Sequence, residues 1–454
     1  MAYSLHDRTV LRAAYGINYS RRGAVGGRAG ARNGTGTLGF SANASFPSAN
    51  GFDPAYNWNN GVPSYPAPPF FDPTLNAGFV AGRGTGGGVT YGDPEIGGRM
   101  PRYQNANAGF QYALARTLTI GATYAGSRGD FLGGSGRGFF ANQLDPRFLA
   151  LGNLLTQPAT AANVAAAQAI VSGVRLPYAN FSGTIAQMLR PFPQYSSVSD
   201  VYGDLARSTY HSLQLLVEKR RSDDGLTVTF NYTFSRTRDN LMARTGYNFD
   251  QDWSVGVNDQ PHVWNALVVY NMPFGADGKP GSGNRAVRAL VKDWQVSGIT
   301  QFRSGRPLAS PTGGIVGACN LPSAGTCYAD FNPNFTGPVR INGNYGDGGV
   351  LSTNPPSYID RAAFQSAAPF TYGNTPRTLA YNLRNPSSFN QDFSVRRDFH
   401  VSRMKLGLGV DVFNVFNNVV FGGIQTTITS ANFGRVSSQT NTSRVGQIKV
   451  RVEF

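Results

Sequence analysis

The sequence predicts an all-β protein, folded as an antiparallel transmembrane β-barrel with long extracellular loops. Three observations support this prediction: a composition typical of β proteins, segments that alternate between apolar and polar residues over membrane-spanning lengths, and connections that are alternately short and long. The third observation discriminates best, because the strands of soluble β-sandwiches also alternate, and a sandwich gives no reason for such a rhythm of connections.

The composition is rich in glycine and aromatic residues. The 454-residue chain holds 56 glycines, 30 phenylalanines and 21 tyrosines, and only 14% of its residues are charged. Together with many Asn, Ser and Thr residues, this is typical of a β protein with long polar loops. No stretch approaches the roughly 18 consecutive apolar residues that mark a transmembrane helix. Any membrane crossing must therefore be made by strands.

The chain is basic, with a formal net charge of +15. Its arginines are scattered along strands and turns, without a helix-turn-helix, zinc-finger or RNA-recognition pattern, so no nucleic acid partner is expected. A basic channel lining, or contact with the anionic headgroups of outer-membrane lipid, fits this scatter better.

Alternation of apolar and polar residues marks the predicted strands. Leu226, Phe230 and Phe234 fall on one face while Thr229 and Asn231 fall on the other, because side chains alternate between the two faces of a strand. About ten such segments lie near or somewhat above the roughly 9–11 residues that cross a bilayer as a tilted strand. They are residues 8–20, 103–115, 117–124, 209–220, 226–235, 262–272, 292–304, 389–399, 406–412 and 445–454.

The connections distinguish a barrel from a sandwich. They are short at 222–225 and 400–402 and long at 129–208, 305–388 and 417–444. Short and long connections alternate along the whole chain, as in a barrel with short periplasmic turns and long extracellular loops. In this topology the last strand runs toward the periplasm and ends there.

The last strand also carries a candidate outer-membrane assembly signal. Ile448, Val450, Val452 and Phe454 alternate with polar residues up to the final position. This pattern resembles the signal that the barrel assembly machinery reads in bacterial outer-membrane barrels, and a terminal aromatic suits the periplasmic aromatic girdle. The alternative is an ordinary edge strand that happens to end in Phe. Together with the connections, the pattern predicts a location in the bacterial cell outer membrane.

The first residues predict a chain that opens inside a hairpin. Residues 2–5 have the pattern of a strand end, 6–9 that of a tight turn and 10–20 that of the next strand. No signal peptide is expected, because "MAYSLHDRTVLRAAYG" lacks the apolar core that such a segment requires. We therefore expect an N-terminally truncated barrel or a fragment.

Several segments, in order, resemble TonB-dependent outer-membrane receptors of the Oar-like group. They are "SLHDRTVLRAAYGINYSR", "NQLDPRFLALGNLL" followed by "MLRPFPQYSSV", "DWQVSGITQFRSGRPL", and the C-terminal stretch that contains Phe413–Asn417 and Asn432–Arg435. The resemblance identifies residues 1–454 as the C-terminal portion of the receptor β-barrel domain, about ten strands of a roughly 22-stranded barrel, with no plug domain.

The resemblance implies a receptor that binds a scarce extracellular ligand and imports it with a plug and the TonB complex, which acts through an N-terminal box. The plug, the box and the N-terminal half do not appear in this sequence, so contact with the TonB complex is expected only through a missing N-terminal part. The alternatives are a self-closed small barrel that acts as a passive pore or adhesin-like surface protein, and a non-functional gene fragment.

Catalysis is not expected. The four histidines are far apart in sequence and form no HExxH pattern, and no GxSxG elbow is present. Glycine runs at 82–88 and 133–138 lack the Lys-Ser/Thr ending and the strand-to-helix context of a phosphate-binding loop. We therefore expect no enzyme activity, no catalytic or metal-binding residues and no cofactor.

Two loops contain candidate ligand-binding residues. Tyr56, Trp58, Tyr65 and Tyr358 lie in segments rich in aromatic, Asn, Pro and Gly residues. Aromatic rings and amides suit a carbohydrate or a peptide through stacking and hydrogen bonds, and a metal chelate is a third class of ligand. The alternative is that these loops pack on one another and cap the barrel.

Three further predictions concern the loops. Cys319 and Cys327 lie close together in "ACNLPSAGTCY" and are expected to form a disulfide in an oxidising compartment; two free thiols are the alternative. Residues 160–172 predict a short helix within an extracellular loop. Residues 35–46 alternate only partly and are assigned to an extracellular loop, because a further membrane strand there would reverse every later strand.

Overall fold

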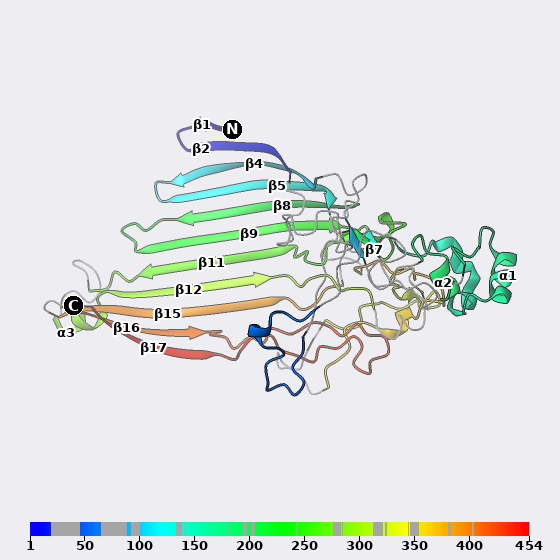
Figure 1. The fold of residues 1–454 in the computed structure, drawn as a ribbon. Helices are drawn as coiled ribbons and strands as arrows, with labels where there is room; N and C mark the ends of the chain where they lie inside the picture. Colours follow the sequence, from blue (N-terminus) through cyan, green and yellow to red (C-terminus); the bar gives the residue numbers. More distant parts are fainter. Residues whose placement is uncertain are drawn as a thin grey trace.

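The computed structural model has one long antiparallel sheet as its main feature (Figure 1). Its path is β1-β2-β4-β5-β8-β9-β11-β12-β15-β16-β17, and β10 pairs with β9 to give 12 strands. The structure describes residues 1–19, 46–64, 89–91, 100–132, 139–140, 142–179, 181–193, 198–200, 205–241, 243–275, 283, 285–311, 321–322, 325–343, 345, 354–379, 383–401 and 404–453.

All ten predicted strands are confirmed, and the predicted strand end at the N-terminus is an eleventh. The bounds are β1 Ala2–His6, β2 Thr9–Tyr19, β4 Arg102–Ala115, β5 Leu118–Leu132, β8 Ala206–Lys219, β9 Leu226–Asp239, β10 Ser254–Val255, β11 His262–Asn271, β12 Trp294–Arg303, β15 Ser388–Val401, β16 Met404–Phe413 and β17 Val445–Glu453. The strands β5 and β9 extend beyond residues 124 and 235, where the predicted strands ended. The sequence did not show these extensions, because the residues there do not alternate between apolar and polar.

The register keeps one face of the sheet apolar across strand after strand. Phe230 lies opposite Val217 of β8 and Ala266 of β11, and Leu408 lies opposite Val450. The other face is polar: Thr229 lies opposite Glu218, for example. Apolar side chains that face outward and polar side chains that face inward are the arrangement of a transmembrane barrel wall.

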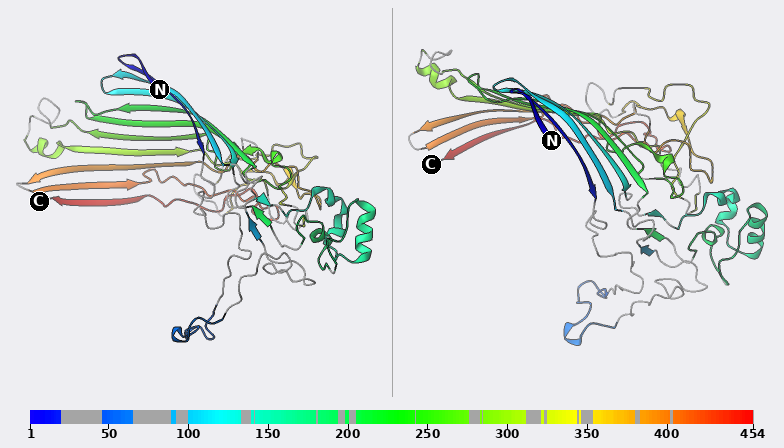
Figure 2. Two further views of the ribbon diagram at one scale, coloured as in Figure 1. Left: turned by 45° about the horizontal axis from the view of Figure 1, so that its top comes forward. Right: turned by 90° about the horizontal axis from the view of Figure 1, so that it is seen from above.

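The two ends of the strand path are β1 and β17, which lie at opposite edges of the sheet (Figure 1). Figure 2 shows that the sheet curves along this path rather than lying flat. Among the described strands, every partner of β1 or β17 lies within this path.

The predicted alternation of short and long connections holds along most of the path, and the exception is the β11–β12 connection at 272–293, which is as long as the connection at 240–261. Connections at 7–8, 116–117 and 220–225 lie at one end of the sheet, and long connections at 240–261 and 304–387 lie at the other. Figure 1 shows the long connections gathered beyond one end of the strands, with α1 farthest from the sheet. The β11–β12 connection lies at the short-turn end and contains α3 (Arg285–Val291), which was not predicted.

The long connections carry the remaining secondary structure. The predicted helix at 160–172 is confirmed as α1 (Ala161–Ile170), and the Thr160 side chain caps it by accepting from the backbone N–H of Asn163. Apart from Phe46, the segment 35–46 lies outside the described residues. The other short elements are η1 Trp58–Asn60, β3 Val89–Tyr91, β6 Phe139–Phe140, η2 Pro146–Thr156, α2 Ile185–Met188, β7 Val198–Asp200, η3 Asp250–Asp252, β13 Asp330–Phe331, η4 Arg361–Ala363 and β14 Phe364–Gln365.

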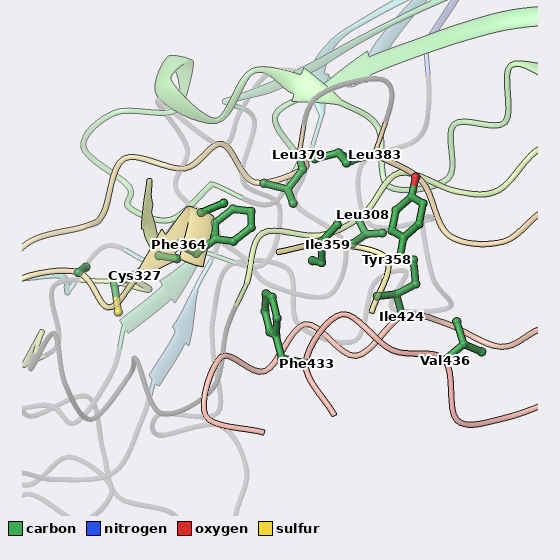
Figure 3. Packing of buried hydrophobic residues seen from close by; sticks show 13 residues of the cluster. Leu308, Cys327, Tyr358, Ile359, Phe364, Leu379, Leu383, Ile424, Phe433 and Val436 are labelled. Atoms are coloured by element: carbon green, nitrogen blue, oxygen red, sulfur yellow. The ribbon is translucent and has the colours of Figure 1, made fainter. Parts of the chain in front are cut away.

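Among the described residues, the two clusters of buried apolar residues lie in the long connections, and the sheet contributes only a few buried apolar residues at strand ends. One cluster, the large loop cluster, is built mostly from the β12–β15 and β16–β17 connections (Figure 3). Its members include Leu308, Ile359, Leu379 and Val436, all almost fully buried. A second cluster forms around η2, α1 and α2. The loops therefore form an assembly with its own hydrophobic interior, which positions their surface residues.

Three buried Arg–Asp pairs hold this assembly in place, and two of them attach it to the sheet. Arg377 Nη2 lies 2.6 Å from Asp239 Oδ1 at the end of β9, and Arg384 Nη2 lies 2.6 Å from Asp259 Oδ2, just before β11. Both arginines belong to the β12–β15 connection. Because burial removes these charges from water, each charged group requires its oppositely charged partner. The pairs therefore hold the largest loop against two strand ends.

The third pair joins two loops. Arg244 donates from Nε (2.9 Å) and Nη2 (2.8 Å) to Oδ1 of Asp252. The same guanidinium donates to the carbonyl oxygens of Gly373 (2.8 Å) and Thr375 (2.9 Å). Both partners of the pair are almost fully buried. Arg244 therefore depends on Asp252 for charge balance while it ties the β9–β11 loop to the β12–β15 loop.

Asp252→Asn is expected to loosen the loop assembly. Removing the charge of one partner leaves the Arg244 guanidinium buried without a counter-ion, which costs about 3–5 kcal/mol. Hydrogen–deuterium exchange of peptides covering 240–261 and 370–378 will measure the loss of protection. The control is Asp250→Asn in the same loop, whose pair with Arg207 is exposed and is expected to contribute under about 1 kcal/mol. Equal exchange in the two variants would contradict the assignment.

The turn between β8 and β9 carries a pH-dependent ion pair. Lys219 Nζ lies 2.6 Å from Asp224 Oδ2. This contact, with the backbone N–H of Leu226 and the hydroxyl of Ser222, lowers the pKa of Asp224 to about 2. Because the folded-state pKa is below the ordinary value of 3.8, the carboxylate stabilises the fold above about pH 4, and this contribution is lost as the pH falls through 2.

Asp224→Asn is therefore expected to lower the unfolding temperature at pH 7, and this effect is expected to shrink strongly as the pH falls to about 2. Unfolding of both proteins in detergent, followed by circular dichroism across this pH range, will test the expectation. Asp223→Asn removes the same charge from the same turn and serves as the control. A difference between wild type and Asp224→Asn that is as large at pH 2 as at pH 7 would exclude this carboxylate as its source.

Candidate ligand site at the long-loop end

A hollow of about 690 Å³ opens at the long-loop end of the last strands. Its volume falls within the range of small-molecule sites, roughly 300–1,000 Å³. The wall combines aromatic rings with side-chain amides and hydroxyls. The lining residues are Tyr345, Pro386, Ser387, Phe389, Phe416, Asn417, Asn418, Val419, Phe421, Gln439 and Ser443.

The turn after β16 forms one wall of the hollow, and asparagines shape it. Asn414 and Asn417 have positive φ angles of 49° and 56°, a conformation that Asn tolerates better than most residues. The Asn414 side chain accepts from the backbone N–H of Asn418 (2.8 Å) and donates to the carbonyl oxygens of Asn418 (2.9 Å) and Thr442 (3.2 Å). This network leaves Phe416 68% exposed at the hollow.

The opposite wall rests on the large loop cluster. Tyr345 packs between Tyr358 and Phe421, with ring centroids 5.2 Å and 6.0 Å away. Burial and the neighbouring Tyr358 raise the pKa of the Tyr345 phenol, so it stays neutral. Packing thus fixes this wall in place. The exposed Phe416 ring can stack on a neutral ligand, and the amides of Asn418 and Gln439 can form hydrogen bonds with it.

Of the predicted ligand residues, Tyr56 and Trp58 contact each other, with ring centroids 5.1 Å apart and ring planes tilted by 58°, and Trp58 is 75% exposed. Tyr65 lies outside the described residues. Tyr358 is only 2% exposed, so its prediction as a surface ligand residue is corrected: its ring belongs to the interior of the large loop cluster (Figure 3). For Tyr358 the alternative of loop packing holds.

Sequence reasoning missed the hollow itself. Phe416, Asn418 and Phe421 stand in "FNVFNNVVFGG", a run with the same mixture of aromatic rings and amides that nominated Tyr56 and Trp58. That composition was a usable signal. What the sequence did not supply was the approach of Tyr345 and Ser387, which lie in a different long connection.

The remaining predicted site residues have separate places. Cys327 is disulfide-bonded and buried in the large loop cluster, while Cys319 lies outside the described residues. On β17, Ile448, Val450 and Val452 share the apolar face and are well exposed. Phe454 lies outside the described residues. The apolar row of the predicted assembly signal is therefore available on an edge strand; its recognition by the assembly machinery remains a prediction.

The described residues bring no three His, Cys, Asp or Glu side chains together in a group fit for a metal ion. Within the same ranges, no helix has both the length and the apolar character needed to cross a membrane.

The family model of the outer membrane beta barrel domain matches residues 1–447. No curated protein matches the chain significantly. Similar solved structures include the ferric-catecholate import receptor Fiu of E. coli K12 (9% identity, TM-score 0.38, 99% of this chain and 33% of that chain). A point mutant of the P. aeruginosa ferric enterobactin receptor PfeA is another (10%, 0.39, 99% and 38%).

A third is P. aeruginosa FpvA bound to a heterologous pyoverdine (9%, 0.39, 100% and 32%). The chain spans about a third of the length of these structures. The family match covers nearly every residue, and the antiparallel sheet has the two-faced register that such a wall requires. The chain thus belongs to the outer membrane beta barrel domain family and is an outer-membrane protein.

Proposed function

We propose that this chain is the C-terminal portion of a TonB-dependent receptor barrel of the Oar-like group, which binds an extracellular ligand for import. The sequence segments that resemble this group support the proposal, as do the strand topology and the ordered long loops. The role is binding and transport, with no catalytic step and no cofactor. Import would require the plug and the contact with the TonB complex that belong to such receptors.

The observation that carries the proposal is the hollow between the β12–β15 and β16–β17 connections. Loops that only cap a barrel need packing, which the large loop cluster supplies. An exposed ring at Phe416 beside the amides of Asn418 and Gln439 is additional to that packing. Because the lining is mostly uncharged, a neutral carbohydrate is the preferred ligand class, ahead of a peptide or a metal chelate.

The strand path supports a barrel larger than this chain. The described partners of β1 and β17 all lie within the path, so each of these strands has one edge without a described partner. Unpaired backbone groups cost several kcal/mol each in hydrocarbon. Further strands that cover both edges would remove this cost. The second candidate, a self-closed small barrel acting as a passive pore or adhesin, would have to bring β1 to β17 instead.

Phe416→Ala is expected to weaken ligand binding roughly threefold to tenfold, because an aromatic contact contributes about 0.5–1.5 kcal/mol. Calorimetric titration of the folded chain with maltohexaose, chitohexaose and a neutral hexapeptide will measure the affinities. Phe52→Ala is the matched control, since Phe52 is also exposed but lies outside the hollow. Equal affinities of the wild type and Phe416→Ala for these ligands would show that the hollow is not the binding site.

The DNA upstream of Met1 separates the two candidate functions. The receptor proposal expects an upstream reading frame, continuous or frameshifted, that encodes a plug and further strands. It also expects the chain alone to form no steady pore in a planar lipid bilayer, because the edges of β1 and β17 remain uncovered. A stable single-channel conductance from the chain alone, with no barrel sequence upstream, would favour the self-closed pore and end the import proposal.

A further inference from the structure

The outward face of the sheet is layered along the strands β4, β5, β8 and β9. On this face β9 presents Leu226, Val228 and Phe230, then Tyr232 and Phe234, and then arginines. β5 repeats the order with Leu118 and Ile120, then Tyr124, and then Arg128. β8 runs from Val217 and Leu215 through His211 to Arg207, and β4 shares only the basic end, at Arg102. This order of aliphatic, aromatic and basic side chains matches the order of hydrocarbon, interface and headgroups in a lipid bilayer.

The aromatic layer contains two Tyr–His pairs. The Tyr124 hydroxyl lies 2.6 Å from His211 Nδ1, and the Tyr232 hydroxyl lies 2.8 Å from His262 Nδ1. Trp264 continues the layer toward β12, stacked on Phe302 at 6.1 Å. Rings that present both an apolar body and a polar tip collect where hydrocarbon meets headgroups. This layer therefore marks the membrane interface at the long-loop end.

Five arginines follow directly beyond the aromatic layer, and we call them the basic belt. Ten residues, about the number that crosses the hydrocarbon, run from Leu226 to Ser235 on β9 and from Leu118 to Ser127 on β5. The arginines begin at the next outward positions on each strand. The basic belt consists of Arg102, Arg128, Arg207, Arg236 and Arg238.

The belt is contiguous across the four strands. Arg238 and Arg128 both lie opposite Thr209 of β8. Arg102 and Arg128 donate to the same carboxylate, Asp130, at 2.8 Å and 3.0 Å. One carboxylate shared by two guanidinium groups neutralises only one of them.

A tryptophan from the β9–β11 loop lies within the belt. The guanidinium carbons of Arg207 and Arg238 lie 5.1 Å and 5.5 Å from the centre of the Trp253 ring. Arg207 also pairs with Asp250 at 2.7 Å. Among the described residues, the printed ion pairs give the five arginines two carboxylates, Asp130 and Asp250, so the belt carries more positive than negative charge. Arg128 and Arg236 are exposed on this face.

We propose that the basic belt binds the phosphate groups of outer-leaflet lipid headgroups at the long-loop end of the barrel. The belt lies on the same face as the lipid-facing apolar rows and one step beyond the aromatic layer, so a molecule seated on it is at headgroup depth. Guanidinium groups bind phosphate oxygens bidentately. This inference rests on the outer-membrane location and does not depend on the proposed import function.

The test uses the chain refolded in dodecyl maltoside micelles, a detergent without charge or phosphate. Native mass spectrometry will measure binding of bisphosphorylated lipid A, dephosphorylated lipid A and inorganic phosphate. We expect the bisphosphorylated lipid to bind roughly tenfold or more tightly than the dephosphorylated lipid. The triple variant Arg128→Gln, Arg236→Gln and Arg238→Gln is expected to lose that preference, and Arg→Lys at the same positions to keep most of it.

The matched control removes three arginines from the opposite end, through Arg116→Gln, Arg220→Gln and Arg221→Gln, and is expected to bind like the wild type. Three results would overturn the proposal. They are equal affinity of the wild type for the two lipids, unchanged lipid preference in the belt variant, and inorganic phosphate displacing the bisphosphorylated lipid at equal concentration, which would indicate a site for free anions. The first comparison needs no variant, so it stands even if the belt variant fails to fold.

Discussion

Side chains of a strand alternate between its two faces, and the structure depends on keeping one set of alternate residues apolar in every strand of the path. A slip of one residue between neighbours would move a whole strand's apolar side chains to the polar face. The regular pairing of Leu406, Leu408 and Val410 with Val452, Val450 and Ile448 shows the constraint at the last hairpin. The strand register is thus fixed because all apolar side chains must lie on the face that contacts lipid. The short turns need only join strands that are already aligned in this way.

A sheet that turns its apolar face to lipid has no conventional core, so the buried apolar residues lie elsewhere. They lie in the long connections, where Leu308, Ile359 and Leu379 form an interior remote from the membrane face. Such an assembly must be attached to the strands by other means. Buried charge pairs at Asp239 and Asp259 provide that attachment. Because a buried arginine tolerates only a narrow geometry, these pairs specify where the loops sit more than they add stability.

The sequence was sufficient for the strands and insufficient for the loops, and the reason is physical. Period-2 alternation is local, so segments such as 226–235 could be recognised without knowing their neighbours. The extensions of β5 and β9 were missed because their outward residues there, including Arg128 and Arg238, meet headgroups and water instead of hydrocarbon. Tyr358 and the hollow beside Phe416 depend on contacts between connections dozens of residues apart. Composition can nominate such residues but cannot show which ones become buried.

The hollow and the charge pairs share one connection, which links a binding event to the barrel wall. Tyr345 and Ser387 line the hollow, and Arg377 and Arg384 lie between them in the chain. The same connection is held at Asp239, the last residue of β9, and at Asp259, which lies just before β11. Uncoupled loop motion would break a buried pair at a cost of several kcal/mol. The proposed ligand contact at the hollow would therefore act on a connection that is anchored at the end of β9 and next to β11.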